Sequence, residues 1–116
     1  MSSIQASAER AGPAKSLAEL NQDAIDLWQK GDLEGACAAY RQLSKDHPEQ
    51  EALQTNFRQV QIQYKYEKLK EANAYRSEGN PTKAVLAYQM IDLDEPANDE
   101  LRFHVGLGLG VAQMGE

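Results

Sequence analysis

The sequence contains little cysteine, few aromatic residues and no long apolar run. Its single cysteine, Cys37, excludes an intramolecular disulfide, which agrees with a reducing compartment. No stretch approaches the roughly 20 apolar residues of a membrane-spanning helix, and the first residues lack the apolar centre of a signal peptide. We therefore expect a cytoplasmic protein that does not bind membranes.

Basic residues are also scarce. The 116 residues include 12 Lys plus Arg against 18 Asp plus Glu, for a net charge of −6. This balance disfavours nucleic acid as a partner and slightly favours a basic ligand. The length and the ordinary apolar and charged content are typical of one globular domain.

The first 15 residues carry one large aliphatic side chain, so we expect 1–15 to be a flexible tail and 16–116 to be the folded domain. Ser16 and Glu19 form a capping-box pattern, which predicts that a helix begins there and covers 17–30.

Turn residues divide the next part of the chain. Gly31 ends the first predicted helix, Asp32 can cap a second over 33–46, and Pro48 ends that one. Two helices joined by so short a turn must lie antiparallel. The sequence therefore predicts a helical hairpin.

Glycine and proline are absent from Glu49 to Glu78, which predicts one long helix near 50–78. Asn80 and Pro81 are typical of the start of a fourth helix, over 81–92. A fifth helix is expected after Pro96, with Asn98 or Asp99 as its cap.

The two hairpins repeat each other at an offset of 48 residues. The pattern Gly, Ala, Tyr, Pro occurs as Gly31, Ala36, Tyr40, Pro48 and again as Gly79, Ala84, Tyr88, Pro96. A repeat of small residues, aromatics and helix breakers indicates a packing scheme shared by successive units.

This pattern resembles the tetratricopeptide repeat (TPR), a 34-residue helix–turn–helix unit. The matching residues are Leu20, Ala24, Leu27, Ala36, Tyr40 and Pro48, then Ala72, Tyr75, Ala84, Tyr88 and Pro96, then Leu107, Gly108 and Val111. The resemblance implies an all-α solenoid of antiparallel hairpins with about five helices, in units 17–48, 49–96 and an incomplete 99–116. Asp23, Glu71 and Lys68 depart from the family pattern. The turns at Gly31 and Gly79 lie 48 residues apart, which exceeds the 34-residue spacing of the family by 14.

In the family that this chain resembles, the first helices of the units line a concave groove that binds a peptide. The residues expected there are Asn21, Ile25, Trp28, Tyr66, Leu69, Asn73 and Arg76, followed by Val105, Leu109 and Ala112. Asn73 and Arg76 would hold a peptide backbone or carboxylate, with Trp28 and Tyr66 as aromatic anchors. Trp28 has a second interpretation, as a lid over the turn at Gly31.

The extra residues fall near 51–64 and form an apolar stripe of Leu53, Phe57, Val60 and Tyr64. This stripe either packs on the second helix or forms a seam for a second copy or a partner helix. The last helix is apolar on several sides, so Leu107, Leu109 and Val111 are further candidates for homodimer contacts.

The residues that carry out catalysis in other proteins do not converge here. We expect Cys37 to be a core residue, and His47 and His104 to be packed or solvated. The acidic run at 92–100 is expected to be a solvated loop, and Gly106, Gly108 and Gly110 to permit close helix packing. We predict no catalytic, cofactor or metal residue.

The sequence therefore predicts a protein–protein interaction module that binds a peptide or partner helix and self-associates, without enzymatic activity. Two alternatives stay open. One is a regulatory or recruitment domain of a larger enzyme or secretion-system component. The other is a self-assembly element of the coiled-coil kind.

Overall fold

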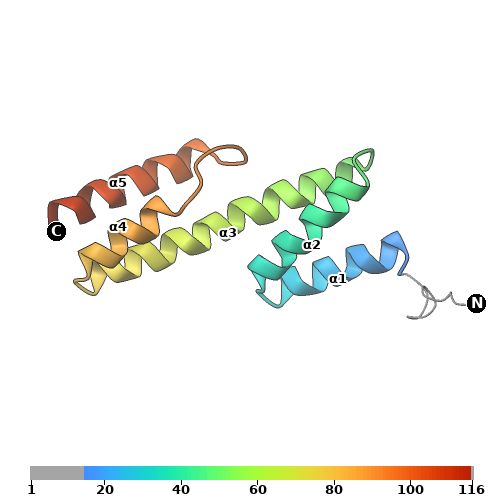
Figure 1. The fold of residues 1–116 in the computed structure, drawn as a ribbon, viewed down its shortest axis with the longest axis horizontal. Coiled ribbons are helices and arrows are strands. Elements are labelled where there is room, and N and C mark those ends of the chain that lie inside the picture. The colour runs from blue at the N-terminus through green and yellow to red at the C-terminus, as the bar shows by residue number, and fades with distance from the viewer. Residues whose placement is uncertain (1–14, 116) are drawn as a thin grey trace, which may run out of the picture.

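The computed structural model describes residues 15–115, which form five helices and no strand (Figure 1). The expected all-α class is therefore correct, while the tail expected at 1–15 lies, except for Lys15, outside the described residues. The helices are α1 (Leu17–Gln29), α2 (Leu33–Asp46), α3 (Glu51–Ser77), α4 (Pro81–Gln89) and α5 (Asp99–Gly115).

Helix ends follow the local signals of the sequence. Ser16 and Glu19 form the predicted capping box, and the Asp32 and Asn80 side chains accept hydrogen bonds from the backbone at the start of α2 and α4. Gly31 and Gly79 adopt φ angles of 89° and 80°, which a residue with a Cβ rarely adopts. These turns reverse the chain, so α1 lies antiparallel to α2, and α3 lies antiparallel to α4.

One helix boundary differs from the prediction. The fourth helix was expected over 81–92, but α4 ends at Gln89. The amide of Ile91 bonds to the carbonyl of Tyr88 in a tighter turn, and the Asp92 side chain accepts from the amide of Asp94 at 2.9 Å. A local side-chain bond of this kind competes with helix continuation.

α3 supports both halves of the molecule. Its 27 residues span about 40 Å, and the described chain measures 65 × 26 × 21 Å. In Figure 1, α1 and α2 lie at one end of α3, and α4 and α5 lie at the other. Each pair of helices therefore builds its own hydrophobic core on a different half of α3.

The first core joins α1, α2 and the first half of α3, and it contains Ala24, Leu33, Ala36, Cys37, Tyr40, Leu43, Leu53 and Val60. The second core joins the rest of α3 to α4, the following loop and α5, and it contains Leu69, Ala72, Ala84, Val85, Tyr88, Ile91, Ala97, Leu101, Val105 and Ala112.

The apolar stripe of α3 lies mostly within the first core. Leu53 and Val60 are buried, and Phe57 and Tyr64 pack at the edge of the same core. The self-association contacts expected of Leu53 and Val60 must be corrected, because α2 covers this face of α3 and leaves neither residue at the surface.

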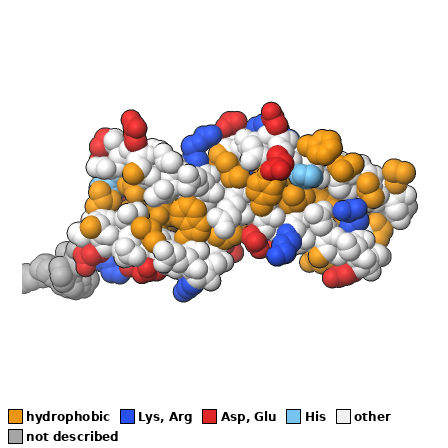
Figure 2. Space-filling model, turned by 180° about the vertical axis from the view of Figure 1, so that it is seen from behind, with side chains coloured by type: hydrophobic (Ala, Val, Ile, Leu, Met, Phe, Trp, Pro, Cys, Tyr) orange, Lys and Arg blue, Asp and Glu red, His pale blue; other side chains and the backbone are white. Residues whose placement is uncertain are grey.

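Gly108 on α5 lies in close contact with the Tyr88 ring of α4. A Cβ at this position would lie 2.5 Å from the Tyr88 ring, whereas a Cβ at Gly106 or Gly110 would meet nothing within 4 Å. The expected role in close packing within the chain thus applies to Gly108. On the outer surface of α5, hydrophobic side chains gather instead (Figure 2).

We predict that Gly108→Ala destabilises the fold by about 1–3 kcal/mol, because the added methyl overpacks the Tyr88 contact. Gly110→Ala should instead be neutral or stabilising by up to about 1 kcal/mol, since alanine favours helix more than glycine does. Urea unfolding followed by circular dichroism at one low protein concentration measures both. Equal effects of the two substitutions would contradict the close contact.

Candidate functional site

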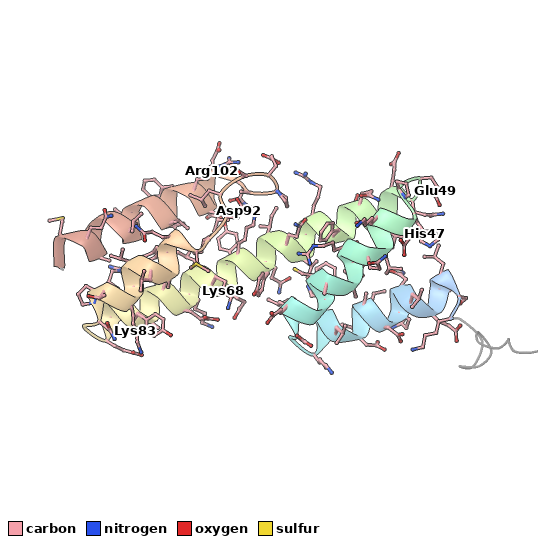
Figure 3. All side chains as sticks on the ribbon, in the orientation of Figure 1. His47, Glu49, Lys68, Lys83, Asp92 and Arg102 are labelled. Atoms are coloured by element: carbon pink, nitrogen blue, oxygen red, sulfur yellow. The ribbon has the colours of Figure 1, made fainter. Side chains whose placement is uncertain are left out.

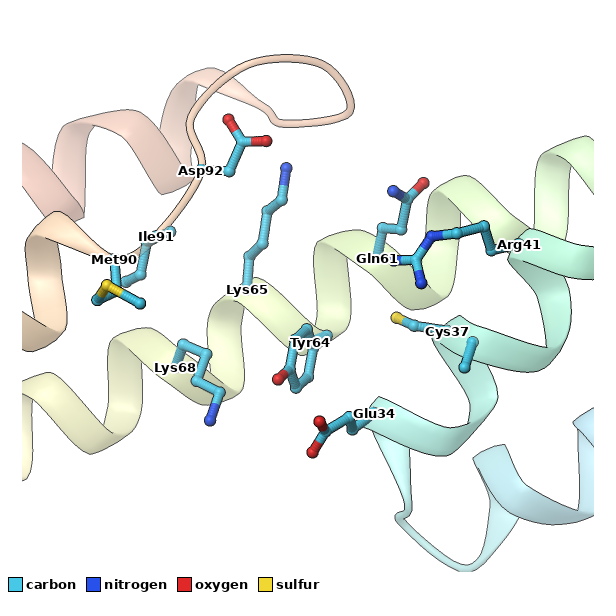
Figure 4. Close-up of a pocket in the computed structure, with 11 residues that line it drawn as sticks. Glu34, Cys37, Arg41, Gln61, Tyr64, Lys65, Lys68, Met90, Ile91 and Asp92 are labelled. Atoms are coloured by element: carbon cyan, nitrogen blue, oxygen red, sulfur yellow. The ribbon is translucent and has the colours of Figure 1, made fainter.

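A groove lies over the middle of α3, between α2 on one side and α4 with the segment that follows it on the other. It consists of two adjoining hollows of about 390 Å³ each, and both include Tyr64 and Lys68 of α3 and Met90 after α4. Figure 4 shows the first hollow, with α2 on one side and the segment after α4 on the other. We call the two hollows together the inter-hairpin groove.

The floor of this groove is one face of α3. Gln61, Tyr64, Lys68, Glu71 and Tyr75 line it at the spacing of residues that share a helix face. From Gln61 to Tyr75 the floor is about 21 Å long at 1.5 Å per residue. The groove is therefore elongated along the helix.

Charged side chains concentrate in the first hollow. Its lining includes three of the 12 basic residues, Arg41, Lys65 and Lys68, and two of the 18 acidic ones, Glu34 and Asp92. Figure 3 places Lys68 on α3 and Asp92 on the loop that follows α4. The first hollow thus has the opposite charge balance to the whole chain.

Lys65 holds the loop wall of the groove in place. Its Nζ donates to the carbonyl oxygen of Asp94 at 3.2 Å and to that of Pro96 at 2.7 Å. Glu95 adds two ion pairs, with Arg58 at 3.2 Å and with Arg102 at 3.3 Å. The two guanidinium groups hold the pKa of Glu95 below its ordinary value, so Glu95 keeps its charge to lower pH than an unpaired glutamate does.

Arg41 and Lys68 keep positive charge within reach of a ligand. Arg41 lies with Cζ 5.9 Å from the centroid of the Phe57 ring and forms no ion pair with any residue of 15–115. Lys68 Nζ lies 5.3 Å from the Tyr64 ring centroid and 3.5 Å from Glu71 Oε1. Tyr64 and then Glu71 raise the pKa of Lys68 above its ordinary value, against the opposing effect of burial.

Met90 is the main apolar feature of the rim. It is 84% exposed and borders both hollows, and a flexible thioether adapts to varied surfaces. Cys37 also lines the first hollow but is buried, and this burial raises the pKa of its thiol. A raised pKa lowers the fraction of reactive thiolate at neutral pH, which agrees with the core position of Cys37.

The predicted peptide ligands Asn73 and Arg76 are bonded within the chain. The Tyr88 hydroxyl donates to Asn73 Oδ1 and accepts from Arg76 Nε at 3.1 Å. Both side chains therefore satisfy the buried tyrosine of the second hairpin, and holding a peptide carboxylate would require breaking these bonds.

Other predicted groove residues lie between α3 and α5. The Tyr66 hydroxyl lies 3.0 Å from Asn98 Oδ1 and 2.9 Å from Glu100 Oε1, at the start of α5. Leu69 is buried in the second core with Val105 and Ala112, and Leu109 packs against them. The expectation that these residues line an open concave surface is wrong. α5 covers the face of α3 that carries Tyr66 and Leu69.

The α1 residues of the predicted groove face the first core. Trp28 meets the Tyr40 ring edge-on at 5.9 Å, and its Nε1 donates to Gln63 Oε1 at 2.7 Å. Ile25 packs against the same core, and Asn21 is half-buried. Trp28 thus connects α1 to α3, so the ten residues expected to line one concave surface do not share one open face.

Sequence reasoning missed Arg41 and Met90 as site residues. The available signal was the long stretch without glycine or proline, which makes α3 long enough to leave part of its middle open between α2 and α4. The pattern within each unit contains no information about this space, because it arises between the units.

Within residues 15–115, no group of three or more His, Cys, Asp or Glu side chains is arranged to hold a metal ion. His47 Nδ1 lies 3.6 Å from Glu49 Oε2, and both residues are marked in Figure 3. His104 is exposed on α5. No helix in the same range is long and apolar enough to cross a bilayer.

Comparisons with protein-family models, with curated proteins and with solved structures found no match for this chain. The resemblance to the TPR family therefore depends on the sequence pattern alone.

The two repeat tyrosines provide a matched test of the contacts described above. Tyr88→Phe should destabilise the protein by about 1–3 kcal/mol, because it leaves Asn73 and Arg76 without their partner. Tyr40→Phe should cost less, because the buried Tyr40 hydroxyl forms no hydrogen bond within residues 15–115. Burial raises the pKa of the Tyr40 hydroxyl, and the nearby Asn56 side chain opposes this rise. Thermal and urea unfolding of both variants measure the difference, and a larger loss for Tyr40→Phe would contradict the assignment.

Proposed function

We propose that this protein is a small helical-repeat scaffold of the TPR type that binds a segment of a partner protein in its inter-hairpin groove. The repeat of turn, alanine and tyrosine supports the family assignment, as does the succession of antiparallel hairpins along the chain. The function proposed is binding without catalysis.

The observation that carries this proposal is the shape of the groove. Its floor on α3 is about 21 Å long and runs past both hollows. That length matches an extended segment of about six residues, at roughly 3.3 Å each, or about four turns of a helix. An elongated surface of this kind fits a polypeptide segment.

The chemistry of the two hollows defines the segment more closely. Arg41 and Lys68 in the first hollow favour acidic side chains or a carboxylate, since Arg and Lys form charge-assisted hydrogen bonds with them. Lys65, whose Nζ donates to two loop carbonyls, adds positive charge to the same hollow. The second hollow adds Tyr75 and Ala87 to the shared Tyr64 and Met90, which favours apolar side chains. The proposed ligand is an acidic segment with apolar anchors on one side.

Selection from a random peptide-display library tests this function without a known partner. We expect the intact chain to enrich peptides that combine Asp or Glu with apolar residues. Arg41→Glu should weaken their binding about tenfold or more, as measured by fluorescence anisotropy, because it reverses a charge that faces the ligand. Binding should also weaken with rising salt.

Lys45→Glu is the matched control. It makes the same charge change on the same helix, at an exposed residue outside the groove, so it should leave the affinity nearly unchanged. Circular dichroism establishes that both variants stay folded. Equal loss of binding in the two variants, or enriched peptides without acidic residues, would contradict the proposed site.

A further inference from the structure

An exposed hydrophobic stripe runs along the outer face of α5 (Figure 2). Phe103, Leu107, Val111 and Met114 are 64%, 56%, 43% and 88% exposed, and they recur at helical spacing. Single exposed apolar residues are ordinary, but a contiguous row marks an interaction surface.

The opposite face of α5 is already in use. Leu101, Val105, Gly108 and Ala112 are buried against the second core. From Val105 to Gly115 the helix carries no charged side chain. A helix that is apolar on both faces is expected to be covered on both.

The internal repeat shows what kind of element covers this position. When Gly108 is aligned with Ala72 and Ala24, the small residues of the repeat, Val111 corresponds to Tyr75 and to Leu27. Leu27 and Tyr75 each pack against a hydrophobic core to which the following helix, α2 or α4, contributes. The equivalent neighbour of α5 is therefore a helix.

The stripe is complementary to itself. Gly106 and Gly110 lie on the same face and have open space above them, so another helix can approach closely there. If two copies of α5 pair antiparallel about a point between residues 108 and 109, Phe103 lies level with Met114 of the second copy. Leu107 then lies level with the second copy's Gly110, and Val111 with its Gly106. Large side chains thus alternate with glycines along the seam.

Charge favours the antiparallel order. Asp99 and Glu100 begin α5 and are exposed, and a parallel pair would bring the two acidic ends together. The antiparallel pair separates them by about 25 Å, the length of the helix, which exceeds the Debye length of about 8 Å at physiological salt. It also aligns the two helix dipoles favourably.

We propose that a second copy of this chain covers the stripe, through antiparallel pairing of α5 with α5. A single helix face provides a small interface, so the dimer should be a weak one that dissociates in the micromolar range. No residue of the inter-hairpin groove belongs to α5, so each copy keeps its groove and the dimer presents two.

Sedimentation equilibrium of the full chain from about 1 μM to about 1 mM tests the dimer. We expect a monomer–dimer equilibrium, and Leu107→Glu and Met114→Glu should each raise the dimer Kd at least tenfold, because each places a charge in an apolar seam. Leu86→Glu, at a 59% exposed leucine on α4, is the control and should leave the Kd unchanged. A monomer at the highest concentration, or a dimer that neither α5 variant weakens, would overturn the proposal.

Oxidative cross-linking tests the antiparallel order. Phe103→Cys and Met114→Cys chains should form a disulfide-linked dimer when mixed and little when oxidised separately, while Cys37 stays buried. Efficient cross-linking of Phe103→Cys with itself would overturn the antiparallel arrangement. Arg41→Glu should leave the dimer Kd unchanged, so a failure of the groove proposal and a failure of the dimer proposal are distinguishable.

Discussion

Both hydrophobic cores depend on the continuity of α3. Its first half completes the core of α1 and α2, its second half completes that of α4 and α5, and the middle is covered by neither hairpin along the groove. A helix normally depends on tertiary packing for most of its stability. In this half-buried middle, good helix-forming residues and the Lys68–Glu71 pair add support. A break there would separate the two cores and abolish the groove, which exists because α3 holds α2 and α4 apart.

The two hairpins each bury a tyrosine, but the side chains that contact it differ. In each, a buried tyrosine lies against the preceding helix, as Tyr40 or as Tyr88. The residue at the equivalent place on that helix is Trp28 in the first hairpin, where it meets the ring edge-on, and Arg76 in the second, where it bonds the hydroxyl. Residues that look like ligand-binding groups in the sequence therefore serve the core. The two surfaces that we propose for partners, the inter-hairpin groove and the outer face of α5, lie outside the contacts within each hairpin.

Much of the fold was predictable because its signals are local. Capping side chains, the glycine turns and the long stretch without glycine or proline act over a few residues, and they place all five helices of residues 15–115 within a few positions. The end of α4 was predicted three residues too late. The Asp92 side chain accepts a hydrogen bond from the Asp94 amide, and such a bond competes with continuation of the helix. The site was predicted poorly for a different reason. Assigning Leu69, Asn73 and Arg76 to an open surface required knowing which neighbour covers each face of α3, and helical periodicity alone does not say.

The sequence by itself determined the helices, their antiparallel order, the repeat and the acidic charge, because these follow from backbone preferences and composition. Tertiary structure alone decided which of the polar residues are free. Asn73 and Arg76 are held by Tyr88, whereas Arg41, which has no ion pair within residues 15–115, lines the same hollow as Lys68 and Met90. The physical reason is that burial and pairing depend on the angle and offset at which whole helices pack. Here the length of α3 sets that offset.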